Sequence, residues 1–270
     1  MRNRSGIYAA LVALALFAVG PLVVLVFNAL KTNSEQTRNP LGPPREPTFA
    51  NFEAAWERGD LATTMLNSAV ITVGTVIGVC VIAGLAAYAL ARLELPRSGA
   101  ILAYLLFATA IPAQLFLVPL FFTWTRIGLY DTRFGLIVIY WALFSPLAVL
   151  LLRAYFLTLP RDFEDAARLD GAGELRILRS IVLPLAWPGF LTVALVVGLF
   201  AWNEFFFAVT FIQSDDKLPV VTSFLAFTQN FTRDWGATSA AGILIVLPVL
   251  VLFLGLQRRF VAGLVGGLKG

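Results

Sequence analysis

The residues with the most distinctive chemistry in this sequence are three neighbours inside an apolar stretch, Trp202, Asn203 and Glu204. A carboxylate within a bilayer-spanning segment costs roughly 2.5–3.5 kcal/mol on insertion scales, so it normally faces a cavity or a partner. An indole ring can cover the C–H face of a solute, while an amide and a carboxylate can bind its hydroxyl groups. Gln114 is a weaker candidate of the same kind. The group predicts part of a solute pathway, with a structural hydrogen-bond knot between helices as the alternative.

A second informative group lies in a polar stretch around Gly171. Asp162 is a suitable helix N-cap. Phe163 lies three and four residues before Ala166 and Ala167, so helical spacing puts all three on one side. Gly171 suits the left-handed residue that ends a helix. The stretch therefore predicts a helix–Gly–helix elbow, which fits equally a knob that docks into a partner's groove and a helix resting on lipid headgroups.

Several kinds of chemistry are excluded by residues that the sequence lacks. It has no histidine, which is the commonest metal ligand and the usual acid–base group near neutral pH. Its one cysteine, Cys80, lies in an apolar run, so neither an internal disulfide nor a cysteine metal site is possible. No lysine lies in a G-x-x-x-x-G-K-[ST] phosphate-binding loop. We therefore expect no catalytic residues, no metal and no cofactor bound by this chain, which argues against an intramembrane enzyme.

The composition indicates that a membrane-spanning fold positions these residues. Of 270 residues, 59% are hydrophobic and 13% charged, whereas soluble domains are about half apolar and a quarter charged. The net charge of +4 is spread over short loops, as expected for a protein in a lipid bilayer, and does not indicate nucleic acid as a partner. Continuous rather than alternating apolar runs favour helices over a barrel.

Six segments reach the roughly 20 apolar residues that a spanning helix needs. They cover residues 7–30, 67–91, 99–122, 134–152, 185–211 and 237–256. The sequence therefore predicts an all-α integral membrane protein with one transmembrane domain over 1–270 and a polar inner connection at 153–184. The proline-rich outer connection 31–61 predicts an irregular loop. Pro112 and Pro119 predict a kink in the third segment.

The first segment has the basic flank of a signal peptide, Arg2 and Arg4. However, its apolar run of 23 residues is long enough to span, and the A-x-A sequence at 13–15 comes too early for cleavage. We expect a retained helix. With the N-terminus inside, the inner segments carry 12 lysines and arginines and the outer ones 8, which predicts that both termini are cytoplasmic.

The stretch 153–184 resembles the EAA motif of permeases in bacterial ABC importers. That motif reads E-A-A, three residues, Gly, nine residues and then I-x-L-P. The matching residues here are Asp165, Ala166, Ala167, Gly171, Ile181, Leu183 and Pro184, with every spacing kept. The one departure is Asp165, which keeps the charge of the family's glutamate on a shorter side chain.

An earlier sequence matches the first part of the motif more literally. Glu53-Ala54-Ala55 is followed by Gly59 at the right spacing. Nine residues later, however, the chain reads A-V-I-T instead of I-x-L-P, and the segment falls on the predicted outer side. We interpret it as an amphipathic stretch leading into the second span.

Further resemblances cover most of the chain. Residues 51–52 with 67–68, residues 201–205 and the tail 257–264 are similar to segments of sugar permeases. Six spans with the motif between the fourth and fifth resemble the maltose-type second permease subunit.

The resemblance implies a permease in the bacterial inner membrane that imports a carbohydrate delivered by an extracytoplasmic binding protein. It also implies a second permease subunit and two ATPase subunits, with ATP and Mg held by the ATPases. In that family the elbow sits in a groove of the ATPase. The coupling role is thereby assigned to Glu164, Asp165, Ala166, Ala167, Asp170 and Gly171.

Two alternatives stay open at this point. The solute of such a permease could instead be a polyol, a glycerol phosphate or an amino sugar. A secondary transporter or channel would predict several paired charges inside the membrane, and Glu204 is the one carboxylate well inside a predicted span. The sequence also has no convincing repeat between its halves, which weakly disfavours a secondary transporter.

Overall fold

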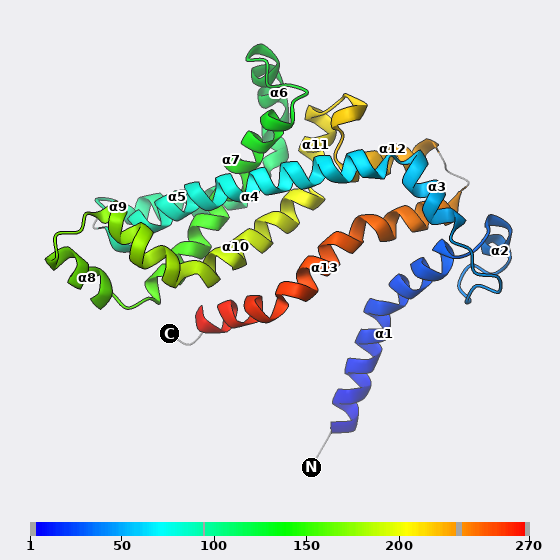
Figure 1. The fold of residues 1–270 in the computed structure, drawn as a ribbon, viewed down its shortest axis with the longest axis horizontal. Helices are drawn as coiled ribbons and strands as arrows, with labels where there is room; N and C mark the ends of the chain where they lie inside the picture. Colours follow the sequence, from blue (N-terminus) through cyan, green and yellow to red (C-terminus); the bar gives the residue numbers. More distant parts are fainter. Residues whose placement is uncertain (1–3, 94, 231–233, 268–270) are drawn as a thin grey trace. The chain divides into compact units, whose positions relative to one another are not determined.

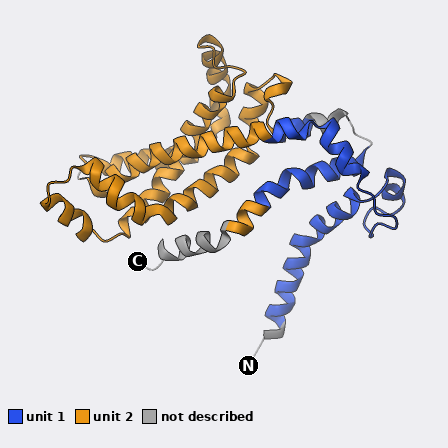
Figure 2. Ribbon diagram, in the orientation of Figure 1, with its two compact units in different colours: residues 1–65, 220–250 blue, residues 66–219, 251–270 orange. Residues whose placement is uncertain are grey.

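The computed structural model describes residues 4–93, 95–230 and 234–267, and within this part of the chain the regular structure is helical, without strands (Figure 1). The all-α prediction is therefore confirmed. The chain divides into two compact units, residues 1–65 with 220–250 and residues 66–219 with 251–270, coloured separately in Figure 2. The side chains of 256–267, which include most of the tail similar to sugar permeases, lie outside the described residues.

The first unit contains the N-terminal apolar helix and the proline-rich connection that follows it. Its elements are α1 (Arg4–Ala29), α2 (Asn33–Arg38), α3 (Ala50–Arg58), the first turn of α4 (Leu61–Arg92), α12 (Val220–Asn230) and much of α13 (Trp235–Gly267). The second unit contains the rest of α4 and the elements between it and α12. These are α5 (Ser98–Ala110), the 3-10 turn Ala113–Phe116, α6 (Leu117–Arg126), α7 (Arg133–Leu157), α8 (Asp162–Leu169), α9 (Glu174–Ile177), α10 (Leu183–Asn203), α11 (Phe206–Phe211) and the 3-10 turn Asp215–Lys217.

Five helices are long and apolar enough to cross a membrane, and a sixth span results if the bent pair α5 and α6 counts as one. The bend between Ser98–Ala110 and Ala113–Arg126 is 89°, so the predicted third segment is not one straight helix. The break lies at Pro112, as the sequence predicted, because the residue before a proline is pushed out of the helical region and Ile111 has ψ 128°. Pro119, in contrast, lies inside α6 and marks no break.

The prediction that residues 31–61 form an irregular loop is wrong in part, because this segment contains α2 and α3 on either side of its proline run. Tertiary hydrogen bonds organise this loop. The buried Lys31 ammonium donates to the carbonyl of Asn39 at 2.7 Å, and the Asn51 amide donates to the carbonyls of Ala29 and Lys31 at 2.8 and 2.7 Å. Contacts of this kind leave no periodic apolar pattern, so the sequence did not show them.

The core of the second unit is built from α4, α7 and α10. Small residues allow close packing: a β-carbon on Gly84 would lie 2.9 Å from the Phe190 ring, and one on Gly189 would lie 2.7 Å from the Tyr155 ring. Such small-residue contacts are typical of helix packing in membranes. There, van der Waals packing rather than the hydrophobic effect drives the association of helices. The C-terminal half of α4 is thereby fixed against the helices that flank α8 and α9 in the sequence.

Candidate functional site

The stretch around Gly171 forms two short helices joined at a left-handed residue. Gly171 has φ +81°, and the amide of Ala172 donates to the carbonyl of Ala167 at 2.9 Å, as in a Schellman helix end. α8 precedes this turn and α9 follows it. Asp162 is the first residue of α8 rather than its cap, because Arg161 occupies the cap position without a side-chain bond. The acidic first turn still lies at the positive end of the helix dipole.

The junction with α10 contains the last residues of the predicted motif. A π-helical turn, Leu178–Val182, includes Ile181, and α10 begins at Leu183 with Pro184 in its first turn. Proline has no N–H for the carbonyl four residues earlier and crowds that carbonyl with its ring. This explains why the helix widens just before Pro184.

Phe163, Ala166 and Ala167 all lie in α8, where helical spacing puts them on one side, but they differ in exposure. Ala167 packs against the core that also contains Ile177, whereas Phe163 and Ala166 are exposed. Leu169 is 90% exposed. The outward surface of the elbow therefore includes large apolar side chains beside a small residue, and its base is buried.

The acidic residues of α8 point in different directions. The Asp165 carboxylate is 63% exposed and pairs with Arg168 at 2.8 Å. Asp170 and Gly171 are also exposed. Glu164, in contrast, is buried and forms an ion pair with Arg92, Oε1 to Nε 2.9 Å. The coupling role that the resemblance assigns to Glu164 stays a prediction, and its carboxylate faces the inside of this chain.

The earlier literal match at Glu53 has a different geometry. Gly59 has φ −84°, in the right-handed region, and Ala55 is fully buried. The segment passes through Asp60 directly into α4. The residue with positive φ between the two helices is Asp60, with φ 41°, so Gly59 does not have the role of Gly171.

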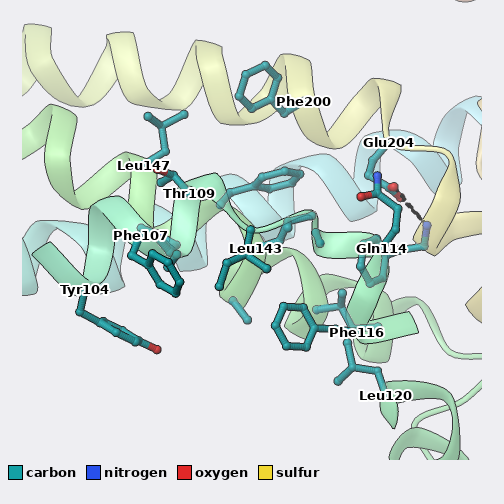
Figure 3. Close-up of a pocket in the computed structure, with 18 residues that line it drawn as sticks. Tyr104, Phe107, Thr109, Gln114, Phe116, Leu120, Leu143, Leu147, Phe200 and Glu204 are labelled. Carbon is teal, nitrogen blue, oxygen red and sulfur yellow. Dashed lines mark hydrogen bonds between the residues drawn. The ribbon is translucent and has the colours of Figure 1, made fainter. Parts of the chain in front are cut away.

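A cavity of about 720 Å³ lies among α5, the following 3-10 turn, α6, α7 and α10 (Figure 3). Its wall is largely apolar and includes the aromatic rings of Tyr104, Phe107 and Phe200. The structure brings two of the four predicted pathway residues, Gln114 and Glu204, to this cavity. A volume of this size and a mostly apolar wall with few polar groups are typical of small-molecule sites.

The other two predicted pathway residues do not line this cavity. The Asn203 amide is exposed and donates to the carbonyl of Leu199 at 2.8 Å. The Trp202 indole Nε1 is buried without a hydrogen-bond partner. The structure therefore separates the Trp202–Asn203–Glu204 group that the sequence joined.

Glu204 ends a helix rather than lying within one. α10 stops at Asn203, Glu204 is extended with ψ 124°, and α11 begins at Phe206, so the predicted continuous segment 185–211 is interrupted. The Glu204 carboxylate accepts from the amides of Phe207 and Ala208, each at 3.1 Å, and from the Tyr140 hydroxyl at 2.7 Å. These bonds support the alternative interpretation, in which Glu204 belongs to a structural hydrogen-bond network between helices. This network also borders the cavity.

A cluster that the sequence did not indicate fixes the loop between α6 and α7 to the loop after α11. Asp131, between α6 and α7, accepts from the amides of Gln213 and Ser214 at 2.9 and 3.0 Å and from the Ser214 hydroxyl, and pairs with Lys217 at 3.0 Å. Burial raises the pKa of Asp131, but these donors outweigh burial and hold that pKa well below its ordinary range. The partners are more than 80 residues apart in sequence, so no local pattern connects them.

We expect Asp131→Asn to lower the melting temperature of the detergent-solubilised protein at pH 7. A carboxyl with a depressed pKa stabilises the fold above the pKa of the unfolded chain, about 3.9, and this contribution is lost as the pH falls through the folded-state pKa. The difference from wild type should therefore be largest near neutral pH and shrink below about pH 4. Asp215→Asn, on an exposed neighbour, is the control. Equal melting temperatures for both variants at pH 7 would contradict the role of Asp131.

Comparison with known proteins gives consistent matches over most of the chain. Residues 81–265 match the family model described as binding-protein-dependent transport system inner membrane component. The chain is 33% identical to the diacetylchitobiose uptake system permease protein NgcG of Streptomyces coelicolor, covering 93% of this chain and 84% of that protein. It is 35% identical to the melibiose/raffinose/stachyose import permease protein MelC of Bacillus subtilis, covering 96% and 93%.

A solved structure has the same fold. It belongs to a bacterial ABC transporter involved in the import of the acidic polysaccharide alginate, with a TM-score of 0.81. The alignment covers 96% of this chain and 99% of the other, at 24% identity. At that identity, the match supports the fold and not the solute.

Proposed function

Because the chain belongs to the family of inner membrane components of binding-protein-dependent transport systems, we propose that it is the permease subunit of an ABC importer for a carbohydrate. The relatives NgcG and MelC are named for the uptake of diacetylchitobiose and of melibiose, raffinose and stachyose. The aromatic cavity with Gln114 and Glu204 on its wall supports the same solute class. Aromatic rings can cover the C–H faces of a sugar, and the amide can bind its hydroxyl groups. A polyol or a glycerol phosphate is the alternative solute.

The proposed importer contains further subunits. A second permease would complete the membrane pathway, two ATPase subunits would bind ATP and Mg inside the cell, and a binding protein would deliver the solute outside. The sequence supports this division of work, because no lysine of the chain lies in a phosphate-binding loop. Both termini would then be cytoplasmic, in agreement with the distribution of basic residues.

The single observation that carries the proposal is the elbow at Gly171. It combines an exposed apolar surface, including Phe163 and Leu169, with a base that is buried and ion-paired. Helices that rest on headgroups are rich in lysine and arginine on their polar face, whereas α8 carries three acidic residues in its first turn and one arginine. Charge thus favours docking into a protein groove over contact with anionic lipid. We propose that this groove belongs to the ATPase.

Reconstitution into proteoliposomes tests the proposal. We expect the chain, its permease partner, the ATPases and the binding protein to take up a labelled oligosaccharide such as melibiose only when ATP is supplied on the ATPase side. Glycerol phosphate and a polyol serve as competing solutes, and an ATPase with its phosphate-binding lysine replaced serves as the control. ATP-independent uptake by this chain alone would contradict the function, and exclusive uptake of a competing solute would contradict the carbohydrate.

A further inference from the structure

The inner end of α4 and the elbow are joined by a buried ion pair. Arg92 Nε lies 2.9 Å from Glu164 Oε1, and the two side chains are 2% and 3% exposed. Charges taken out of water need close partners, and removing one of them leaves the other uncompensated in the interior. Water therefore cannot take the place of a removed partner, because the remaining charge stays buried.

A second connection lies one helical turn earlier on the same face of α4. The Tyr88 hydroxyl donates to the Glu174 carboxylate at 2.5 Å. Arg168 pairs with Glu174 at 2.8 Å and lies 3.6 Å from Glu164, so it bridges the two acidic residues that α4 contacts. Residues four apart on a helix are neighbours, and α4 therefore contacts both helices of the elbow through side chains on one face.

The arginines around this point also bind the end of α4 itself. Arg153 and Arg161 donate to the carbonyls of Leu90 and Ala91, each at 3.2 Å. Arg92 donates to the carbonyl of Leu159 at 2.9 Å. The last carbonyls of a helix have no partner within it and carry its negative dipole end, so cations stabilise them. The end of α4 is thereby fixed to the segment that leads into the elbow.

The chain connects the elbow directly to α7 and α10, but not to α4. Arg92 and Glu164 are 72 residues apart in sequence, so α4 can follow the elbow only through side-chain and hydrogen-bond contacts. The exposed apolar side chains of the elbow, Phe163 and Leu169, are not among the residues that make these contacts. Docking and transmission are thus carried by different residues.

We propose that Glu164 and Arg92 are positioning residues that make α4 move with the elbow when the ATPase acts on it. This inference rests on the proposed function of the elbow. Glu164 is then not a docking residue, in contrast to Asp165 on the same helical turn. Loss of the pair should leave the docking surface intact and disconnect the second span from it.

Distance measurement between spin labels on the assembled importer tests this inference. With Cys80 replaced by alanine, one label is placed at Leu175 on α9 and one at Val81 on α4, which are both exposed. We expect the distance to be equal in the nucleotide-free and ATP-bound wild type, since the two elements move together. In Glu164→Gln the distance should differ between the two states. An unchanged distance in an assembled Glu164→Gln complex would overturn the proposal.

Transport supplies the second readout. Glu164→Gln is expected to lower the amount of solute imported per ATP hydrolysed at least tenfold while assembly and basal ATP hydrolysis persist. Glu57→Gln, an exposed glutamate in α3, is the matched control and should import normally. If Glu164→Gln does not assemble, Tyr88→Phe removes only the neighbouring bond and should show a smaller change in the same direction. Import by Glu164→Gln within twofold of wild type would overturn the proposal.

The two readouts separate this inference from the proposed function. The label distances are compared with and without ATP, and their measurement requires no imported solute. They therefore test the role of the ion pair independently of which solute is carried. A complex that imports no carbohydrate, yet keeps the label distance constant in the wild type and changes it in Glu164→Gln, would contradict the solute and support the ion pair.

Discussion

Gly171→Asp is expected to reduce import to background while the protein still inserts into the membrane and folds. Gly171 has φ +81°, and an L-residue in the left-handed region costs roughly 1–2 kcal/mol. A β-carbon there meets no atom within 4 Å, so the effect is conformational and electrostatic rather than steric. The new carboxylate would also join Asp165 and Asp170 on the exposed surface. ATP-driven uptake and membrane content of the variant measure the two outcomes.

Two matched variants separate strain from charge. Gly173→Asp adds the same carboxylate two residues further on, at a position with φ −74° and equally open space, so it tests charge without backbone strain. Gly171→Asn keeps the side-chain size without the charge, and asparagine tolerates the left-handed region better than most residues. We expect both to import more than Gly171→Asp. Normal coupling of ATP hydrolysis to import in Gly171→Asp would contradict the role of the elbow.

Glu204→Ala is expected to lower both the melting temperature and the import rate. The change leaves the amides of Phe207 and Ala208 and the hydroxyl of Tyr140 without their acceptor. A buried donor without a partner costs about 1–3 kcal/mol. The start of α11 would lose its cap, and the wall of the cavity would lose its link between α7 and α10. Thermal unfolding in detergent and uptake into proteoliposomes measure the two effects.

The variant Gln114→Ala distinguishes a role of the cavity in solute passage from the structural role of the hydrogen bonds at Glu204. Gln114 lines the same cavity as Glu204, and within the described residues its side chain makes no hydrogen bond. We therefore expect this variant to reduce import without lowering the melting temperature. Tyr140→Phe, which removes one of the bonds to Glu204, should lower the melting temperature by less than Glu204→Ala. A Glu204→Ala protein as stable as wild type would show that the bonds of Glu204 do not hold α11.

Local features of the sequence were sufficient for the spans and the elbow turn. Long apolar runs specify spanning helices because each residue meets lipid or another apolar residue wherever the helix packs. Pro112 predicted the break before α6 since its ring restricts the neighbouring residue directly. Gly171 predicted a left-handed turn for a similar reason, because the preference belongs to one residue.

The direction of each acidic side chain depended on residues far away in the chain. Glu164 and Asp165 are adjacent and equally charged, yet one is buried against Arg92 and the other is exposed. Glu204 became a helix cap because Tyr140, 64 residues earlier, and the start of α11 both reach it. The same is true of Asp131 and the loop after α11. The sequence determined the long apolar helices and where the elbow turns, and the tertiary structure decided which polar groups lie inside, because burial and pairing depend on contacts between distant residues.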